Sequence, residues 1–184
     1  MKIAAIVGST RKESYNLKLA KYIQERYQDK FTLDIVEIGD LPFYNQDTEN
    51  EPTAEVVEFK KRIKEADAVL WVTPEYNGTI TANMKNAIDW LSRVDQVMIG
   101  KPSWIAGASM GALGTVKAQA HLRDILFAPG LSSPVLPGNE VLIGAVHEKM
   151  DENGDLTDEA TIDFLDGVVD NVVQWLEKNY VVTN

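Results

Sequence analysis

Short runs of apolar residues recur along the chain and predict five β-strands. The runs cover residues 2–7, 33–38, 68–73, 103–108 and 141–146. Runs that are continuous, and do not alternate with polar residues, indicate strands buried on both faces. Strands of this kind are typical of a parallel sheet that is covered by helices on each side.

The stretches between these runs carry apolar residues at three- and four-residue spacing, which predicts amphipathic helices. The clearest of them are residues 17–27, 56–63, 84–91 and 162–176. Thr157 is expected to cap the last helix, with Asp158 and Glu159 in its first turn, where the helix dipole favours acids.

The alternation of strands and helices predicts right-handed crossovers, and therefore a three-layer α/β sandwich of five strands and five helices. Periodicity alone leaves two strand orders open, which are 2-1-3-4-5 and half of a Rossmann fold. No repeat or linker interrupts residues 1–184, so a single domain is expected. The two long loops, 39–52 and 130–138, are either surface connections or functional segments.

The composition narrows the classes of partner. The 184 residues include 18 Lys+Arg and 28 Asp+Glu, a formal net charge of −10, which argues against nucleic acid or an anionic membrane as the main partner. Without cysteine, and with His121 and His147 expected at the surface or in helix contacts, no metal site or cysteine nucleophile is predicted. No apolar run reaches the ~20 residues of a membrane span and no signal peptide is recognised, so a cytoplasmic protein is expected.

Ligands of such a sheet bind at the carboxyl ends of the strands, near the point where the strand order reverses. The first strand is followed there by residues 8–17 (GSTRKESYNL), which lack both the GxGxxG fingerprint and the GxxxxGK[ST] phosphate loop. The segment still suits a phosphate, because a helix starts near Ser14. The side chains of Ser9, Ser14 and Asn16 can donate hydrogen bonds to the phosphate, and Arg11 can neutralise its charge. The alternative is that Ser14 is simply a helix N-cap.

Two further segments follow neighbouring strands. Residues 74–78 (PEYNG) place a turn at Asn77-Gly78 and offer the flat face of Tyr76. Residues 109–114 (SMGALG) are small enough for a ligand to approach the backbone. The three segments together predict a flat ligand with a polar edge and a phosphate, and FMN fits this description.

The three segments resemble the NADPH-dependent FMN reductase family, flavodoxin-like enzymes that include quinone, azo-dye and chromate reductases. The likeness runs from residue 2 to about residue 128, and its matching stretches are 8–16 (GSTRKESYN), 41–47 (LPFYNQD), 66–90 (ADAVLWVTPEYNGTITANMKNAIDW) and 109–123. The resemblance implies a flavodoxin-like three-layer α/β/α sandwich, a five-stranded parallel sheet of order 2-1-3-4-5, and FMN bound without a covalent bond.

The resemblance also implies three groups of FMN contacts. The phosphate contacts are Ser9, Arg11, Ser14, Asn16 and Leu17. The ring contacts are Pro74, Glu75, Tyr76, Asn77 and Gly78. The third loop contributes Ser109, Met110, Gly111 and Gly114. Two departures bear on the pocket for the second substrate: Met110 and Ala112 stand where relatives often have Pro and Gly, and Thr81-Ala82 replaces a common Pro-Gly.

The expected function is that of an FMN-dependent NAD(P)H oxidoreductase. Hydride passes from NADPH or NADH to N5 of FMN, and then, in a ping-pong scheme, to a quinone, azo compound, flavin or similar electron acceptor in the same cleft. No catalytic side chain is required, and backbone N–H groups of Asn77 and Gly78 are expected near N5. The alternative is a flavodoxin-like electron carrier without its own NAD(P)H reductase activity. A homodimer, or a tetramer, with the flavin near the interface is also implied. The electron acceptor and the choice between NADH and NADPH stay open.

Overall fold

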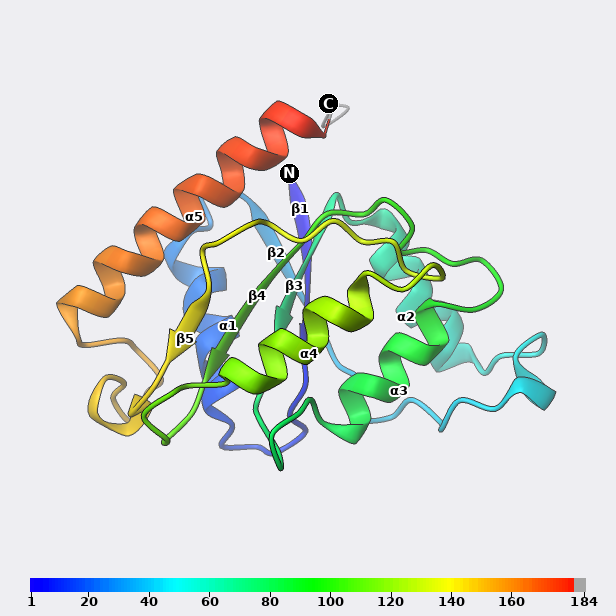
Figure 1. The fold of residues 1–184 in the computed structure, drawn as a ribbon, viewed down its shortest axis with the longest axis horizontal. Coiled ribbons are helices and arrows are strands. Elements are labelled where there is room, and N and C mark those ends of the chain that lie inside the picture. Colours follow the sequence, from blue (N-terminus) through cyan, green and yellow to red (C-terminus); the bar gives the residue numbers. More distant parts are fainter. Residues whose placement is uncertain (181–184) are drawn as a thin grey trace.

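In the computed structural model, which describes residues 1–180, the five expected strands form one parallel sheet in the order β2-β1-β3-β4-β5 (Figure 1). The strands are β1 (Lys2–Val7), β2 (Thr32–Val36), β3 (Ala68–Val72), β4 (Ser103–Ala108) and β5 (Val141–Ile143). This is the order that the family resemblance implies, and it excludes the half-Rossmann arrangement. Residues 181–184 of the expected domain lie outside the described part of the chain.

The sheet separates two hydrophobic cores, because successive side chains of a strand point to opposite faces. In β1, Ile3 and Ala5 belong to one core, whereas Ala4 and Ile6 belong to the other. Helices α1 (Tyr15–Arg26) and α5 (Glu159–Asn179) cover the first core. Helices α2 (Ala54–Glu65), α3 (Ala82–Leu91) and α4 (Val116–Leu126) cover the second. The predicted burial of the strands on both faces is thereby confirmed.

The end of β5 and the start of α5 differ from the sequence-based expectation. The strand stops at Ile143, short of the expected residue 146, because Ala145 adopts a left-handed φ of 48° and a short 3₁₀ helix, η2 (Val146–Glu148), follows. The N-cap of α5 is Asp158 and not Thr157: the Asp158 carboxylate accepts the backbone N–H of Thr161 at 2.9 Å. A carboxylate is the stronger acceptor at a helix N-terminus, because the helix dipole favours its charge.

The two long loops have different structural roles. In the 130–138 loop, Pro134 accepts a hydrogen bond from the N–H of Ser103, and Leu136 donates one to the carbonyl of Ser103. The loop therefore extends the sheet at the amino end of β4, far from the carboxyl edge. The 39–52 loop contains the short 3₁₀ helix η1 (Gln46–Thr48) and lies against α3. Among residues 1–180, no helix is long and apolar enough to cross a membrane.

Candidate functional site

Three segments meet at the carboxyl edge of the sheet, which is the lower edge in Figure 1. They are loop A (residues 8–14), loop B (residues 73–81) and loop C (residues 109–115). The Thr81 hydroxyl donates to the carbonyl oxygen of Gly8 at 2.6 Å and joins loop B to loop A. The Asn16 amide exchanges two hydrogen bonds with the backbone of Ala108, at 2.9 and 3.0 Å, and joins α1 to the end of β4. The loops that the sequence singled out are therefore brought together.

Loop A ends at a helix N-terminus with free donors. The Ser14 hydroxyl caps α1 by accepting the N–H of Leu17 at 3.3 Å, and its own proton remains available to donate. Within the described chain, the backbone N–H groups of Lys12, Glu13 and Tyr15 have no hydrogen-bond acceptor. Free N–H groups at the start of a helix form an anion site, since they add to the positive end of the dipole.

Arg11 supplies the positive charge beside these donors. Its guanidinium lies 6.0 Å from the centre of the Tyr15 ring, and no carboxylate of the described residues pairs with it. The Ser9 hydroxyl accepts a hydrogen bond from the backbone N–H of Arg11, with an oxygen–nitrogen distance of 3.4 Å. A cavity of about 410 Å³ opens here, lined by Ser9, Arg11 and Leu17 of the predicted site and by residues 35–40 at the end of β2.

Loop B contains a two-residue hairpin turn. Tyr76 and Thr79 exchange two backbone hydrogen bonds, and between them Asn77 and Gly78 both have positive φ, at 52° and 77°. This is the conformation of a type I′ turn, for which Asn-Gly is the favoured sequence. The N–H groups of Asn77 and Gly78 donate to no other part of the described chain, so the turn presents them at the sheet edge.

The side chain of Glu75 turns away from the edge and caps α4. Its carboxylate accepts the N–H groups of Lys117 and Ala118, at 2.9 and 3.2 Å. The neighbouring Pro74 packs on Gly8, where an added Cβ would lie 3.0 Å from the proline ring. Pro74 and Glu75 therefore position the turn, while Tyr76, which is 52% exposed, remains open to a ligand.

Loop C is held against the end of β5. The Ser109 N–H donates to Ile143, and the carbonyl of Gly111 accepts the N–H of Ala145 at 3.1 Å. Gly114 has a φ of 62°, and a Cβ there would lie 3.0 Å from the backbone of Leu142. Loop C therefore needs a glycine at this point, while its outer part stays exposed.

The predicted site residues thus fall into two groups. Within residues 1–180, Arg11, Tyr76, Asn77 and Gly78 leave charge, ring face or backbone donors free, and Met110 is 60% exposed. In contrast, Ser9, Ser14, Asn16, Leu17, Pro74, Glu75 and Ser109 have side chains that are engaged within the protein. The N–H groups of Gly111 and Gly114 are also engaged, since they donate to the Ser109 hydroxyl and to the Gly111 carbonyl oxygen. Asn16, expected to donate to phosphate through its amide, is only 4% exposed and bound to Ala108, so its backbone N–H is the group left for an anion.

The sequence analysis gave no structural role at the site to several residues that shape it. Thr81 bridges loops A and B while capping α3, and Thr79 pairs with His121 of α4 through atoms 2.9 Å apart. Thr81 could have been found as an N-cap preceding a helical pattern. The pairing of Thr79 with His121 joins residues 42 positions apart, and no local signal indicates it.

The 39–52 loop borders α3 on the same side of the sheet as loop B. Asn86 and Trp90 donate to the carbonyl oxygen of Pro42, at 3.0 and 2.8 Å, and Arg93 forms a two-point ion pair with Glu49. The Arg93 guanidinium lowers the pKa of Glu49 to about 2, with help from the Tyr44 hydroxyl. Trp90 is therefore covered by the chain's own loop.

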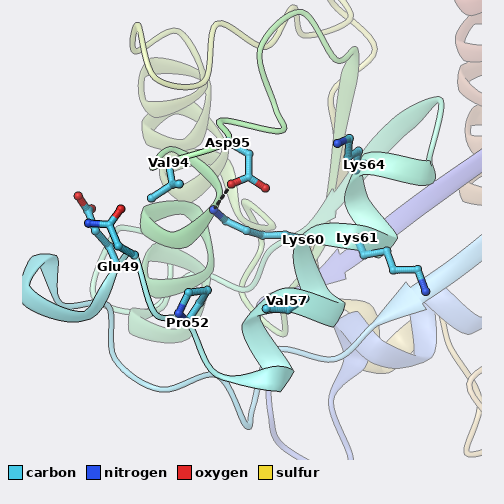
Figure 2. A pocket seen from close by; sticks show the side chains of 9 residues that line it. Glu49, Pro52, Val57, Lys60, Lys61, Lys64, Val94 and Asp95 are labelled. Atoms are coloured by element: carbon cyan, nitrogen blue, oxygen red, sulfur yellow. Dashed lines mark ion pairs between the residues drawn. The ribbon is translucent and has the colours of Figure 1, made fainter.

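A second cavity, of about 430 Å³, lies between the 39–52 loop and α2 (Figure 2). None of the predicted site residues lines it. Figure 2 shows Lys60 reaching towards Asp95, 3.6 Å away, while Lys61 points in the opposite direction. The Lys60 ammonium also donates to the carbonyl oxygen of Arg93 at 2.8 Å. Because the Lys60 ammonium is already paired, this cavity is assigned no ligand. The two Lys60 contacts instead join α2 to residues 93–95.

The residues present at the sheet edge fit FMN. Loop A offers backbone donors, a hydroxyl and the Arg11 charge to a phosphate. Loops B and C offer exposed backbone N–H groups beside the apolar Tyr76 and Leu113 side chains, which suits a flat ring with a polar edge. Within the described residues, no group of acidic or histidine side chains could hold a metal ion.

Comparison with known proteins gives a family match over most of the chain. The model of the family described as NADPH-dependent FMN reductase matches residues 1–148. The chain is 42% identical over 183 residues to the NADH-dependent flavin reductase subunit 2 of Lactobacillus johnsonii, covering 97% of this chain and 98% of that protein. It is 36% identical to the quinone reductase of Escherichia coli K12 over 172 residues, 91% of this chain and 90% of that protein.

A solved structure agrees with the sequence comparisons. FerB from Paracoccus denitrificans, described as a flavoenzyme NAD(P)H:(acceptor) oxidoreductase, superimposes with a TM-score of 0.88 at 39% identity. The match covers 96% of this chain and 97% of that one. The likeness therefore includes the whole sheet and all three loops.

Proposed function

Because the chain belongs to the NADPH-dependent FMN reductase family and is an FMN-dependent NAD(P)H oxidoreductase, we propose that loops A, B and C hold its FMN at the carboxyl edge of the sheet. The observation that carries this proposal is the convergence of free donors there. Loop A leaves N–H groups and Arg11 without partners in residues 1–180, and the turn of loop B leaves two more N–H groups. We further propose that residues 1–184 form one FMN-binding domain.

Loop A is proposed to bind the phosphate. The N–H groups of Lys12, Glu13 and Tyr15 donate to its oxygens, as does the Ser14 hydroxyl, whose oxygen already caps the helix. The Arg11 guanidinium offers a forked contact to the same group. Asn16 donates to the phosphate through its backbone N–H. The two hydrogen bonds between its side-chain amide and the backbone of Ala108 fix the distance between loops A and C.

Loops B and C are proposed to hold the ring. When bound, FMN supplies the redox chemistry, taking a hydride from NAD(P)H and passing electrons to an acceptor. The N–H groups of Asn77 and Gly78 are proposed to stabilise the negative charge that the ring gains. Tyr76 presents an apolar face beside them, and the exposed part of loop C is proposed to contact the ring from the other side. No side chain is assigned a proton-transfer role.

The electron acceptor is proposed to be a quinone or a flavin. The relatives that carry this proposal are named quinone reductase and flavin reductase. A flat aromatic acceptor suits an open ring face that is lined by Tyr76, Met110 and Leu113. Both substrates use the same space, so donor and acceptor bind in turn.

A homodimer, or a tetramer, is proposed as the working assembly. Phe43 is 80% exposed on a loop that Asn86 and Trp90 hold in place, and Leu113 is 73% exposed on loop C. Rigidly held apolar side chains of this size are typical of subunit contacts. A molecular mass in solution that corresponds to a single chain at micromolar concentration would refute this assembly.

The function is tested by the visible spectrum of the purified protein under anaerobic conditions. Flavin absorbance that bleaches when NADPH or NADH is added is the expected result, and the two rates identify the preferred donor. A bound flavin that stays oxidised with both donors would instead support the electron-carrier alternative. A protein that carries no flavin and takes up no added FMN would contradict the assignment of loop A.

A further inference from the structure

One exposed side of α4 carries two basic side chains beside loop B. The aliphatic stem of Lys117 lies along the hairpin turn, with its Cδ 3.5 Å from the position of a Cβ on Gly78. One turn further, His121 Nδ1 is 2.9 Å from the Thr79 hydroxyl. The Glu75 carboxylate fixes the start of the helix by accepting the Lys117 N–H. Two contacts thus hold these side chains at the rim of the proposed ring site, and the Glu75 carboxylate fixes the start of the helix that carries them.

The charge on this rim is not used within the protein. In residues 1–180, no carboxylate lies within ion-pair distance of the Lys117 ammonium, and both Lys117 and His121 are exposed. Two other basic side chains lie at this edge, on loop A: Arg11, which is assigned to the FMN phosphate, and its neighbour Lys12. A chain with a net charge of −10 repels a polyanionic substrate, unless a local positive site offsets that field.

NAD(P)H is such a polyanion. It carries a pyrophosphate, and NADPH carries a further 2′-phosphate, so its nicotinamide can approach the ring only if these groups are accommodated nearby. We propose that Lys117, assisted by His121, binds the phosphates of the pyridine dinucleotide. This inference rests on the proposed function, since it places the electron donor on the open side of the FMN site.

The chemistry of the two side chains suits this role. Lys117 is a flexible point charge that can follow a phosphate group without a fixed geometry. His121 has Nδ1 engaged with Thr79, which leaves Nε2 towards solvent. When Nδ1 accepts a hydrogen bond from the Thr79 hydroxyl, the neutral imidazole carries its hydrogen on Nε2, which can donate to an anion. The charged imidazole carries a hydrogen on both nitrogens, so Nε2 can donate in that state as well.

The experiment measures the binding of NADP⁺ and NAD⁺ to the oxidised holoenzyme, because neither nucleotide can reduce the flavin. Lys117→Met removes the charge but keeps the stem that packs on Gly78. It is expected to raise the dissociation constant about fivefold, as for one partly exposed charge pair, and to weaken its dependence on salt. A rise for both nucleotides assigns Lys117 to the pyrophosphate, and a rise for NADP⁺ alone assigns it to the 2′-phosphate.

Two further variants make the test specific. Lys178→Met, on the last turn of α5 at the other end of the molecule, causes the same change in net charge and should leave both dissociation constants unchanged. His121→Asn preserves a partner for Thr79 but lacks the outer nitrogen, and should give a smaller rise. Equal dissociation constants for Lys117→Met and the wild type would overturn the inference.

The failure of this inference can be distinguished from failure of the proposed function. Lys117→Met should bind FMN as tightly as the wild type does, measured by quenching of flavin fluorescence. If wild-type protein is bleached by NADPH or NADH while Lys117→Met binds NADP⁺ and NAD⁺ normally, the reductase assignment stands and the role of Lys117 is refuted. If wild-type flavin stays oxidised with both donors, the reductase assignment itself fails.

Discussion

Arg11 shows how a single residue in this protein can be fully available for a ligand. It lies among free backbone N–H groups, and its guanidinium has no carboxylate partner among residues 1–180. In contrast, the neighbouring Asn16 amide is bound to Ala108. Two polar side chains of one motif therefore differ in role, because one faces the edge of the sheet and the other faces its interior.

Arg11→Gln should weaken FMN binding about tenfold, which corresponds to about 1.4 kcal/mol for a charge-assisted contact. Riboflavin lacks the phosphate, so its affinity should not change. Both dissociation constants are measured by quenching of flavin fluorescence. An equal loss for FMN and riboflavin would show that Arg11 acts on the ring or on loop structure, and not on phosphate.

Gly107→Ala should destabilise the fold by about 2–3 kcal/mol, because a Cβ would lie 1.9 Å from the Thr115 hydroxyl and 2.6 Å from the carbonyl oxygen of Thr73. Gly167 is the matched control: it lies in α5, and nothing is within 4 Å of an added Cβ. Gly167→Ala should stabilise the protein by about 0.5–1 kcal/mol, since alanine is the better helix former. Urea unfolding measures the stability of both variants. A Gly167→Ala variant that is less stable than the wild type would contradict the prediction that a Cβ fits at this position.

At the scale of elements, the site depends on loops that are joined to helices distant in sequence. Glu75 in loop B caps α4, and Thr81 caps α3 while it bonds to Gly8 of loop A. Each contact satisfies a helix N–H and also fixes a loop. The cofactor edge is therefore as rigid as the helices behind it, and a cap mutation should affect both stability and binding.

Glu75→Leu should cost about 1 kcal/mol of stability, because it removes the acceptor for the Lys117 and Ala118 N–H groups. It should also weaken FMN binding, since the hairpin turn loses one of its attachments to α4. Glu75→Gln keeps an acceptor oxygen and should lie between the wild type and Glu75→Leu in both respects. Thermal unfolding and flavin titration measure the two effects. If Glu75→Leu is destabilised but binds FMN with wild-type affinity, the helix cap does not affect the cofactor site and the predicted loss of binding is wrong.

For the whole molecule, paired carboxylates make stability depend on pH. The Arg62 guanidinium lowers the pKa of Asp34, and the Arg26 guanidinium lowers that of Asp166, which joins α1 to α5. Glu49, paired with Arg93, has a pKa lowered to about 2 from an ordinary value of 4.5. In each case the folded state holds the charged form more strongly than the unfolded chain does, so acid favours unfolding.

The free energy of unfolding should therefore be constant near neutral pH and fall as the pH decreases from about 5 towards 2. Glu49→Gln should lower stability near pH 7 and give a shallower fall over this window, because one of the depressed carboxylates is missing. Glu177→Gln removes an exposed carboxylate with no ion-pair partner in residues 1–180 and should keep the wild-type slope. Urea unfolding at a series of pH values checks both, and identical slopes for all three proteins would contradict the assignment.

The amino-acid sequence by itself determined the layers of this protein and identified the three loops of the proposed FMN site. Continuous apolar strands and amphipathic helices depend on local periodicity, so the buried sheet could be predicted, and the turn at Asn77-Gly78 could be predicted from its two residues. The strand order came from motif resemblance, whereas FMN was predicted from the three loop segments and then supported by that resemblance. The tertiary structure alone decided which polar groups stay free. Asn16 and Glu75 find partners 92 and 42 residues away, and Lys117, beside Gly78, has no ion-pair partner among residues 1–180. Such pairings depend on which elements the fold brings together, and no local pattern encodes them.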